Sequence, residues 1–429
     1  MKILMASLAI DGHFNPLTGI GMRLHANGHD VRWYTGSRYE SKLAELGIPY
    51  FPFQRAVEHT PENLNDLYPE RAALKAGPRA VSFDAEKVFA SNVGHFFDDI
   101  RDVRTKFSFD VLVEDGAVYV QRLVTEILGL PVVSVISISN MHRDPLVPPL
   151  FFGLKPAAGP RGKLRDRALK VISDKLVMAP AQRLYASILA EYGVTLAANE
   201  LLSDEPYVAS TAVVQSGTAS FEYPRSIANP RVHYVGPLLP YRRSQSQPLT
   251  FIDRLCRYRR TVLVTQGTVD NKDPSKLLVP TIEALKETDT LIVVSTGNSR
   301  TAELRSRYAA DNVVIEDFID FDAALKHADA YVTNGGFGGV MLSLANGVPL
   351  ICAGIKEGKN DVNAHVDYHR VGIDLRTEKP KRDRIRRAVD RVCSEPQWKA
   401  RAQAFQAEIH QLDPPAVVER LILDLVPGR

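Results

Sequence analysis

Four glycines, Gly335, Gly336, Gly338 and Gly339, stand close together in the segment YVTNGGFGGVMLSLANGVPL. The residues before them predict a short buried strand, and the residues after them predict a helix. Glycine has no Cβ atom, and a helix N-terminus offers free N–H groups and the positive end of its dipole. This junction therefore favours a phosphate-binding site. A tight turn with close packing of strand on helix is the structural alternative, although it accounts for fewer glycines.

His13 and Asp115 are the residues whose types fit proton transfer. His13 follows one apolar run and Asp115 ends another, so in a parallel sheet both would lie at the carboxyl edge. A carboxylate there would hold the imidazole in one tautomer and make it a stronger base for a hydroxyl proton. The same spacing also fits a loop histidine that caps a helix starting near Pro16, and an aspartate that caps its own strand end. Glu114 should point to the opposite face of the strand.

Strand-length apolar runs alternate with helical patterns along most of the chain, which predicts parallel sheets covered by helices. The alternation stops at residues 235–249, VGPLLPYRRSQSQPL, whose composition is that of a linker, and then restarts. We expect an α/β fold of two doubly wound, Rossmann-like domains, residues 1–234 and 250–429, facing each other across a cleft. The last helix is a candidate for packing back on the N-terminal domain.

The expected strands are the segments 2–9, 30–36, 109–115 and 131–137 in the first domain, and 261–267, 290–297, 312–318, 330–336 and 349–354 in the second. A helix is expected over residues 16–28, with its proline in the first turn and Gly28 at its end. Residues 140–200 combine a Pro-rich loop with basic amphipathic helices, which could form a lid facing an acceptor or a helical cover.

The composition excludes several classes of protein. The 53 basic and 50 acidic residues are mixed along the chain and leave a net charge of +3, which gives no reason to expect nucleic acid as a partner. No run approaches the roughly 20 apolar residues of a membrane span, so we expect no stable membrane insertion. Cys256, Cys352 and Cys393 show no metal-ligand spacing, which favours buried thiols in a reducing cytoplasm. The N-terminus lacks the features of a signal peptide.

The glycine loop does not match the common nucleotide motifs. No Lys-Ser/Thr pair follows it, so it is not a Walker loop. The turn after the first strand, LAIDGHFNP, lacks G-x-G-x-x-G, and the strand at 30–36 ends without a ribose-binding acid, which disfavours an oxidoreductase. Two more glycine turns, at Gly267 and Thr268 and at Gly297, also follow expected strands and could line the same edge.

In order along the chain, the segments DGHFNPLTG, VGPLLP, VTQGTV and TNGGFGGVMLSLANGVPL resemble the nucleotide-sugar glycosyltransferases of family 1, which have the GT-B fold. The similarity runs through nearly the whole chain. It looks closest to bacterial flavonoid rhamnosyltransferases, which share DVRWYT, VTQGTV and a segment like KEGKN. It implies an inverting, metal-independent hexosyltransferase without a cofactor. Its partners would be a nucleotide diphosphate sugar and a small, apolar, hydroxylated acceptor such as a flavonoid.

The resemblance also implies a role for each matching residue. His13 would be the general base for the acceptor hydroxyl, and Asp115 would balance its charge. The residues implied in donor binding are Gly267, Thr268, Phe318, Ile319, Asn334, Gly335, Gly336, Gly338, Gly339, Lys359 and Asn360. Within this set, the glycine loop would bind the diphosphate through its amides and helix dipole. The segment DFD at 320–322 imitates the metal motif of another fold, and we expect it to be an acid pair at a helix start.

Three departures from the family pattern bear on the donor. Asn334 stands where the family usually has histidine, and Leu342 stands where a glutamate that binds both ribose hydroxyls is expected. Residues 358–360 replace an Asp-Gln pair that reads the sugar, although the match can shift by one residue there. A missing ribose carboxylate matters less for a thymidine nucleotide, and a missing sugar carboxylate fits a deoxysugar. We therefore expect a dTDP-6-deoxyhexose as donor, L-rhamnose first.

Other functions remain open at this point. A UDP-glucose-dependent glucosyltransferase of similar acceptors is the first alternative. A nucleotide-sugar 2-epimerase and a non-catalytic nucleotide-sugar-binding protein are the others. The acceptor pocket is the least defined part of the expected site. Its walls could be formed by the Pro-rich segment 142–153 and by Phe51, Phe53 and Phe83, or these residues could belong to the core.

Overall fold

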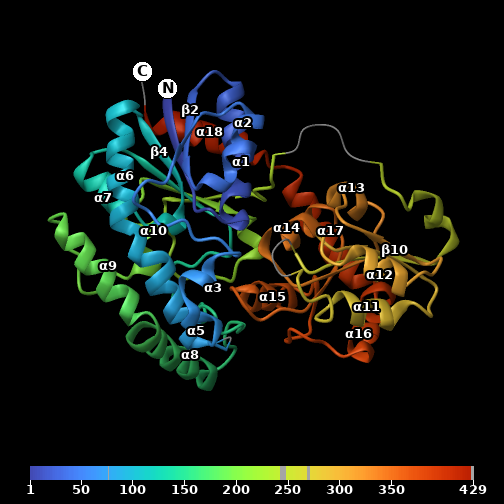
Figure 1. Cartoon of the computed structure of the whole chain (residues 1–429). Helices are drawn as coiled ribbons and strands as arrows, with labels where there is room; N and C mark the ends of the chain where they lie inside the picture. Colours follow the sequence, from blue (N-terminus) through green and yellow to red (C-terminus); the bar gives the residue numbers. More distant parts are fainter. Residues whose placement is uncertain (76, 242–247, 268–270, 427–429) are drawn as a thin grey trace. The chain divides into compact units, whose positions relative to one another are not determined.

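The computed structural model describes residues 1–75, 77–241, 248–267 and 271–426. The chain divides into two compact units, each built on one parallel sheet (Figure 1). The first unit spans Met1–Phe151, Pro156–Tyr241 and Leu412–Arg429, and the second spans Phe152–Lys155 and Arg242–Gln411. The predicted α/β class with two doubly wound sheets is confirmed.

The sheet of the first unit has the strand order β3-β2-β1-β4-β5-β6-β7. Its strands are β1 (Lys2–Ala6), β2 (Asp30–Thr35), β3 (Tyr50–Pro52), β4 (Val111–Asp115), β5 (Val132–Ile136), β6 (Ala212–Ser216) and β7 (Val232–Gly236). Each neighbouring pair is parallel. The strand order reverses direction between β1 and β4, because the chain first adds β2 and β3 on one side of β1 and then adds β4 on the other.

Side chains alternate between the two faces of this sheet and build a hydrophobic core on each. Ile3 and Met5 belong to one core, whereas Leu4 and Ala6 belong to the other. The covering helices are α1 (Asp11–Ala26), α2 (Glu40–Leu46), α6 (Val93–Lys106), α7 (Gln121–Ile127), α9 (Ala179–Glu191) and α18 (Pro414–Leu425). Shorter or more exposed helices are α3 (Leu64–Leu67), α4 (Pro69–Ala72), α5 (Pro78–Phe83), α8 (Pro160–Ile172) and α10 (Glu205–Val208).

The last helix of the chain, α18, packs in the first unit next to α1 (Figure 1). Its Val418 and Ile422 are buried in the core beneath β1. Its Glu419 accepts hydrogen bonds from Arg23 Nε at 3.0 Å and from Asn27 Nδ2 at 2.6 Å. The C-terminal residues therefore complete the unit that the N-terminal residues begin.

The sheet of the second unit has the strand order β10-β9-β8-β11-β12-β13, and its pairs are also parallel. Its strands are β8 (Arg260–Thr265), β9 (Thr290–Ser295), β10 (Val313–Glu316), β11 (Ala330–Thr333), β12 (Leu350–Cys352) and β13 (Gly372–Asp374). Its helices are α11 (Leu278–Leu285), α12 (Thr301–Arg307), α13 (Phe321–Leu325), α14 (Phe337–Ala345), α15 (Lys359–Tyr368), α16 (Arg382–Ser394) and α17 (Pro396–Ile409). Here the strand order reverses between β8 and β11.

Some bounds differ from those expected from the sequence. Strand β7 continues to Gly236, so the expected linker start at residue 235 falls inside a strand. Residues 152–155 belong to the second unit, although they lie within the range expected for the first. Helix α9 is a helical cover, because Tyr185 and Leu189 are fully buried in the core. Helix α8, in contrast, leaves most of its side chains exposed.

Candidate active site

His13 lies in the first turn of helix α1, which begins at Asp11. Its main-chain N–H donates to the carbonyl of Ile10, the residue that precedes the helix, at 2.9 Å. The expected helix start at Pro16 is therefore wrong, and His13 is not a loop residue. The acidic side chain of Asp11 is favourable at the positive end of the helix, which helps the helix begin there.

Pro16 lies inside α1 without ending it. Proline has no N–H, so the carbonyl of Gly12, four residues earlier, lacks its helical partner. The hydroxyl of Ser137, just beyond β5, donates to that carbonyl at 3.1 Å. This contact ties the first turn of α1, and with it His13, to the carboxyl edge of the sheet.

His13 and Asp115 form a hydrogen bond in which 2.7 Å separates His13 Nδ1 from Asp115 Oδ2. Asp115 is the last residue of β4, and its Oδ1 accepts from the N–H of Ala117 at 3.3 Å. The pair lies where the strand order reverses between β1 and β4, the place where doubly wound sheets bind ligands. An ionised carboxylate can only accept hydrogen bonds, so Nδ1 carries the proton and Nε2 keeps a lone pair.

Opposing effects act on the pKa of His13. Burial lowers this pKa because it disfavours the charged form, whereas the charge of Asp115 and its hydrogen bond raise it, and the net shift is upward. The His13 side chain keeps 25% of its surface exposed, against 5% for Asp115. His13 is therefore an accessible base of raised basicity.

Glu114 does not join this pair. On a strand it points to the face opposite Asp115, where it is fully buried and accepts from Ser134 Oγ at 3.0 Å. Burial raises the pKa of Glu114 well above its ordinary value. The expected separation of the two carboxyl groups is confirmed.

A second junction of the same kind lies in the other unit, where the strand order reverses between β8 and β11. The side-chain amide of Asn334, just after β11, donates to the carbonyl of Gln266, just after β8. Gly267 has a φ of +82°, and a Cβ atom there would lie 3.0 Å from Asn334 Nδ2. The structure thus brings Gly267 and Asn334 together. Thr268, expected beside them, lies outside the described residues.

The helix that follows β11 begins within the glycine loop, earlier than the sequence predicted. Helix α14 starts at Phe337, so Gly336 precedes it and Gly338 and Gly339 lie in its first turn. The first main-chain bond of the helix runs from Val340 N–H to the carbonyl of Gly336 at 3.0 Å. The preceding N–H groups therefore face the open end of the helix. A Cβ atom on Gly338 would meet nothing within 4 Å. The main-chain amides at the start of α14 therefore lie next to open space, which an anion needs in order to reach them.

Gly335 is needed for a different reason. Its φ is +84°, and an added Cβ atom would lie 1.7 Å from Oδ1 of Asn363 in α15. Asn363 is fully buried, and its Nδ2 donates to the carbonyl of Gly354 at 3.0 Å. Tight packing, the structural alternative, thus explains this glycine, whereas it does not explain Gly338.

The other residues expected in donor binding lie at the same edge of the second sheet. Phe318 and Ile319 follow β10, and the Phe318 side chain is 70% exposed. Lys359 and Asn360 open α15, which follows β12. Next to them, the carboxylate of Asp361 accepts from the N–H of Gly153 at 2.7 Å.

Asp320 caps helix α13, because its Oδ1 accepts from the N–H groups of Asp322 and Ala323 at 3.1 and 3.2 Å. The expectation of an acid pair at a helix start is confirmed. Across the described ranges, no group of three or more His, Cys, Asp and Glu side chains is placed to hold a metal ion.

Two small hollows lie in the first unit. One adjoins the start of α1 and is lined by Leu8, Ala9, Ile10, Phe53, Val57, His59, Val88 and Phe96. The other is lined mainly by the Pro-rich loop at 140–151 and by the end of α8. Phe53 thus borders a hollow, whereas Phe51 packs near Phe107 and Phe83 packs edge-on against Tyr68.

Two broader expectations can be compared with the structure. In the part of the chain that the structure describes, no helix is long and apolar enough to cross a bilayer. Cys352 is buried and Cys393 is partly buried, but Cys256 is exposed. The expectation of buried thiols is therefore wrong for Cys256, which lies in a short surface turn of helix at Ile252–Arg257.

Comparisons with known proteins agree with this geometry. Residues 280–424 match the family model described as erythromycin biosynthesis protein CIII-like, C-terminal domain. The crystal structure of the glycotransferase of kitacinnamycin superposes with a TM-score of 0.77 at 19% identity, covering 99% of each chain. The 4′-demethylrebeccamycin synthase of Lentzea aerocolonigenes is 33% identical over 428 residues, which is 100% of this chain and 99% of that protein. The chain belongs to the family 1 glycosyltransferases of the GT-B fold.

Further relatives of this glycosyltransferase carry different names. It is 27% identical over 427 residues to UDP-glycosyltransferase 2 of Phaeomoniella chlamydospora, which covers 96% of this chain and 92% of that protein. A spinosyn rhamnosyltransferase complexed with thymidine diphosphate superposes with a TM-score of 0.68 at 17% identity, covering 98% of this chain and 100% of the other. The predicted family, fold and transferase activity are confirmed, whereas rhamnose and a flavonoid acceptor stay predictions.

Sequence reasoning missed several residues that hold the site of this glycosyltransferase in place. Ser137 supports the first turn of α1, and Asn363 packs against the glycine loop. Asp99 of α6 binds the loop that follows β3. Each acts on main-chain groups far away in the sequence, and a single polar residue in a helix or loop pattern does not indicate which group it will meet.

Proposed function

We propose that this protein is an inverting glycosyltransferase in which His13 takes the proton of an acceptor hydroxyl. The observation that carries the proposal is the 2.7 Å hydrogen bond between His13 Nδ1 and Asp115 Oδ2. That bond keeps the lone pair on Nε2 and would stabilise the imidazolium that forms after proton uptake. The exposed quarter of the His13 side chain leaves room for a hydroxyl group to approach.

In the proposed reaction the acceptor oxygen attacks the anomeric carbon of the sugar. A new carbon–oxygen bond forms while the bond from that carbon to the diphosphate oxygen breaks. The electron pair leaves with the nucleoside diphosphate, and the hydroxyl proton ends on His13 Nε2. Attack from the side opposite the leaving group inverts the configuration at the anomeric carbon.

The glycine loop is proposed to bind the diphosphate. The N-terminal amides of α14, its dipole and the open space at Gly338 support this assignment. These groups would stabilise the negative charge that develops on the leaving group, so the proposed reaction uses no metal and no cofactor. Asn334 would shape the loop, since one of its N–H groups already donates to the carbonyl of Gln266.

For the donor we propose a dTDP-6-deoxyhexose, with L-rhamnose first. Leu342 of α14 occupies the position of the expected ribose-binding glutamate, and an apolar side chain cannot accept from a 2′-hydroxyl. Asp361, the acid beside residues 358–360, accepts from the main chain of Gly153, which disfavours its use as a sugar ligand. The relative solved with thymidine diphosphate, itself named a rhamnosyltransferase, supports the same choice.

A UDP-glucose-dependent activity is the second candidate. This candidate is favoured because a relative that aligns over 427 residues is named a UDP-glycosyltransferase. For the acceptor we propose a phenol such as a flavonoid, because the hollow beside the start of α1 has mostly apolar walls. A phenolic hydroxyl is also acidic enough for a histidine base.

A matrix of donors and acceptors read by mass spectrometry tests these proposals. The donors are dTDP-L-rhamnose, dTDP-glucose and UDP-glucose, and the acceptors are quercetin, smaller phenols and none. We expect a rhamnosyl adduct of a phenol. A much higher kcat/KM with UDP-glucose would overturn the donor assignment, and donor consumption without an acceptor would indicate an epimerase. His13→Ala should abolish transfer and keep dTDP affinity, and transfer that survives this change would refute the role of His13.

A further inference from the structure

The loop that follows β3, residues 53–59, contributes to the lining of the hollow beside the start of α1. We call this segment the β3 loop. Phe53, Val57 and His59 line that hollow from this loop. The lining also includes Ile10, whose carbonyl accepts from the N–H of His13 at 2.9 Å. The β3 loop therefore helps to shape a hollow at the start of α1, the helix whose first turn carries the proposed base.

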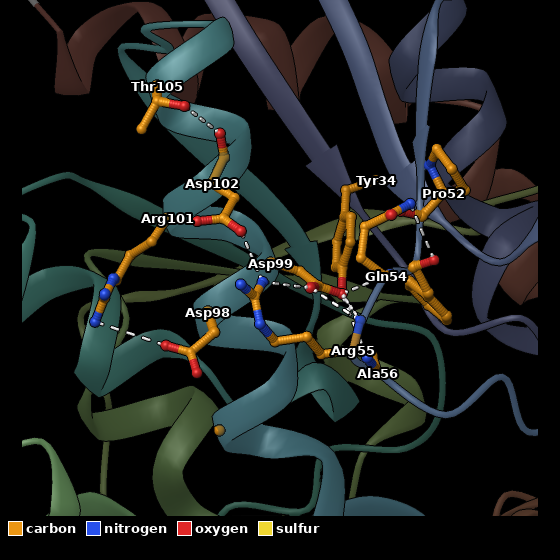
Figure 2. Close-up of polar contacts among 12 residues, drawn as sticks. Tyr34, Pro52, Gln54, Arg55, Ala56, Asp98, Asp99, Arg101, Asp102 and Thr105 are labelled. Atoms are coloured by element: carbon orange, nitrogen blue, oxygen red, sulfur yellow. Dashed lines mark hydrogen bonds and ion pairs between the residues drawn. The ribbon is translucent and has the colours of Figure 1, made fainter.

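The β3 loop belongs to no helix or strand, so its N–H groups need other acceptors. Asp99 of α6 supplies them (Figure 2). Its carboxylate accepts from the N–H groups of Gln54 at 2.9 Å, Arg55 at 3.0 Å and Ala56 at 3.3 Å. The same carboxylate accepts from the hydroxyl of Tyr34 at 2.8 Å and from Arg55 Nη1 at 3.1 Å. One buried side chain thus holds three successive amides of the loop.

The rest of the β3 loop is held in a similar way by neutral groups. Asn92 accepts from the N–H of Val57 at 3.0 Å and donates to its carbonyl at 2.9 Å. Asn92 Nδ2 also lies 3.3 Å from His59 Nδ1, and His59 Nε2 lies 3.0 Å from the hydroxyl of Tyr68. Burial lowers the pKa of His59, because it disfavours the charged form of the ring. Both ring nitrogens of His59 therefore have partners within the protein, and the β3 loop contributes the apolar side chains Phe53 and Val57 to the hollow.

The negative charge of Asp99 is part of this arrangement. Its side chain is 1% exposed, and burial alone would raise its pKa. The amide of Gln54, the hydroxyl of Tyr34 and the amides of Arg55 and Ala56 outweigh that effect and lower the pKa. Hydrogen bonds to an ionised acceptor are roughly twice as strong as those between neutral groups. A neutral side chain of the same shape would hold the loop less firmly.

We propose that Asp99 is a positioning residue for the acceptor. Its carboxylate fixes the β3 loop so that Phe53 and Val57 present an apolar wall at the start of α1, and an apolar, ring-bearing part of the acceptor binds against that wall while its hydroxyl reaches His13. The inference rests on the proposed function, because it takes His13 as the base that the acceptor must reach.

Asp99→Asn tests this inference, because it keeps the shape of the side chain and removes its charge. With quercetin as the probe, we expect KM for quercetin to rise about ten- to a hundredfold, because the wall contributes to binding of the acceptor equally in the ground state and the transition state. The kcat value and the affinity for dTDP, measured by calorimetry, should stay close to those of the wild type. A general loss of structure would change all three together.

Asp98→Asn is the matched control. Asp98 is the neighbour of Asp99 on α6, but its carboxylate lies 3.6 Å from Arg101 and is hydrogen-bonded to Tyr192, so it does not hold the β3 loop (Figure 2). This variant should behave as the wild type. If Asp99→Asn does not fold, Val57→Ser replaces it. Val57 is 40% exposed, so a change there spares the core, and it should raise KM for quercetin in the same direction.

The outcomes separate this inference from the proposed function. One outcome is that the wild type transfers sugar and that Asp99→Asn, or Val57→Ser where that variant is used, has an unchanged KM for quercetin. This outcome overturns the inference and leaves the proposed function intact. A wild type that transfers no sugar, or that does not bind quercetin, overturns the inference as well. A wild type that transfers no sugar also overturns the proposed function.

Discussion

His13 and Asp115 are 102 positions apart in the sequence, yet 2.7 Å separates the imidazole Nδ1 from the carboxylate Oδ2. The pair exists because β1 and β4 are neighbours, with Ala6 in register with Glu114. Each residue lies just beyond or at the end of its strand, so the sheet delivers both to one edge. The strength of the proposed base therefore depends on Asp115 as much as on His13.

Asp115→Asn should change how activity depends on pH. The charge of Asp115 raises the pKa of His13, so its removal should lower that pKa. A histidine base works only when neutral, so wild-type kcat/KM should fall as pH drops through the raised pKa. In Asp115→Asn this fall should move to lower pH, while the plateau drops about 10²- to 10⁴-fold because the tautomer is no longer held. An unmoved acid limb in the pH profile would show that another group titrates.

Gly335→Ala and Gly338→Ala should have opposite effects on stability. At Gly335 the methyl group would meet Asn363 in a backbone conformation that alanine disfavours, so the free energy of unfolding should fall by about 1–3 kcal/mol. At Gly338 the methyl group enters open space in a helix, so stability should rise by at most about 1 kcal/mol. Denaturant unfolding measures both.

Gly338→Ala should also weaken the binding of dTDP and UDP, although the protein is no less stable. The added methyl group would occupy the space through which the diphosphate is proposed to approach the amides of α14. Isothermal titration calorimetry with each nucleotide measures the change. Wild-type affinity in this variant would place the diphosphate away from Gly338.

Leu342→Glu should favour ribonucleotide donors. The new carboxylate could accept from the ribose hydroxyls, so the ratio of kcat/KM for UDP-linked over dTDP-linked donors should rise about tenfold. Leu342→Gln, which has nearly the same shape without the charge, is the control and should shift the ratio less. If neither variant alters the ratio, the side chain at 342 does not contact the ribose.

Glu419→Gln should destabilise the first unit in a pH-dependent way. Burial raises the pKa of Glu419, but hydrogen bonds from Asn27 and Arg23 outweigh it and the pKa is lowered. A lowered pKa means that the carboxylate stabilises the fold above the pKa of the unfolded chain and loses this effect as pH falls. The free energy of unfolding should drop by about 1–3 kcal/mol at neutral pH.

The difference between Glu419→Gln and the wild type should shrink below about pH 4, where glutamate protonates in the unfolded chain. Thermal unfolding at neutral and acidic pH measures it. Asp424→Asn, an exposed position on the same helix, should leave stability unchanged at both pH values. A difference that is the same at every pH would mean that the charge of Glu419 is not involved.

Much of the fold was predictable because its strongest signals are local. The runs of Val, Ile and Leu that became β4, β8 and β9 are recognisable without their neighbours, and their alternation with helices indicates parallel sheets. The edge positions of His13 and Asn334 follow from the same rule, since a residue just after a parallel strand lies at its carboxyl edge.

The features that could not be predicted from the sequence depend on contacts between residues that are distant along the chain. The start of α1 at Asp11 requires the hydroxyl of Ser137 to satisfy the carbonyl that Pro16 leaves open. Asp98 and Asp99 look equivalent in the sequence, yet only Asp99 binds the amides of the β3 loop. The tertiary structure distinguishes them, because Asp99 contacts Tyr34 of β2 whereas Asp98 contacts Arg101.

The burial of Val418 and Ile422 beneath β1 has a consequence for how the protein is made. The first sheet emerges early from the ribosome, but part of its core is encoded near the end of the message. Every strand of the second sheet has been synthesised before those two side chains are available. A nascent chain halted before residue 418 would therefore carry an N-terminal sheet with one apolar face incompletely covered, a target for chaperones and for aggregation.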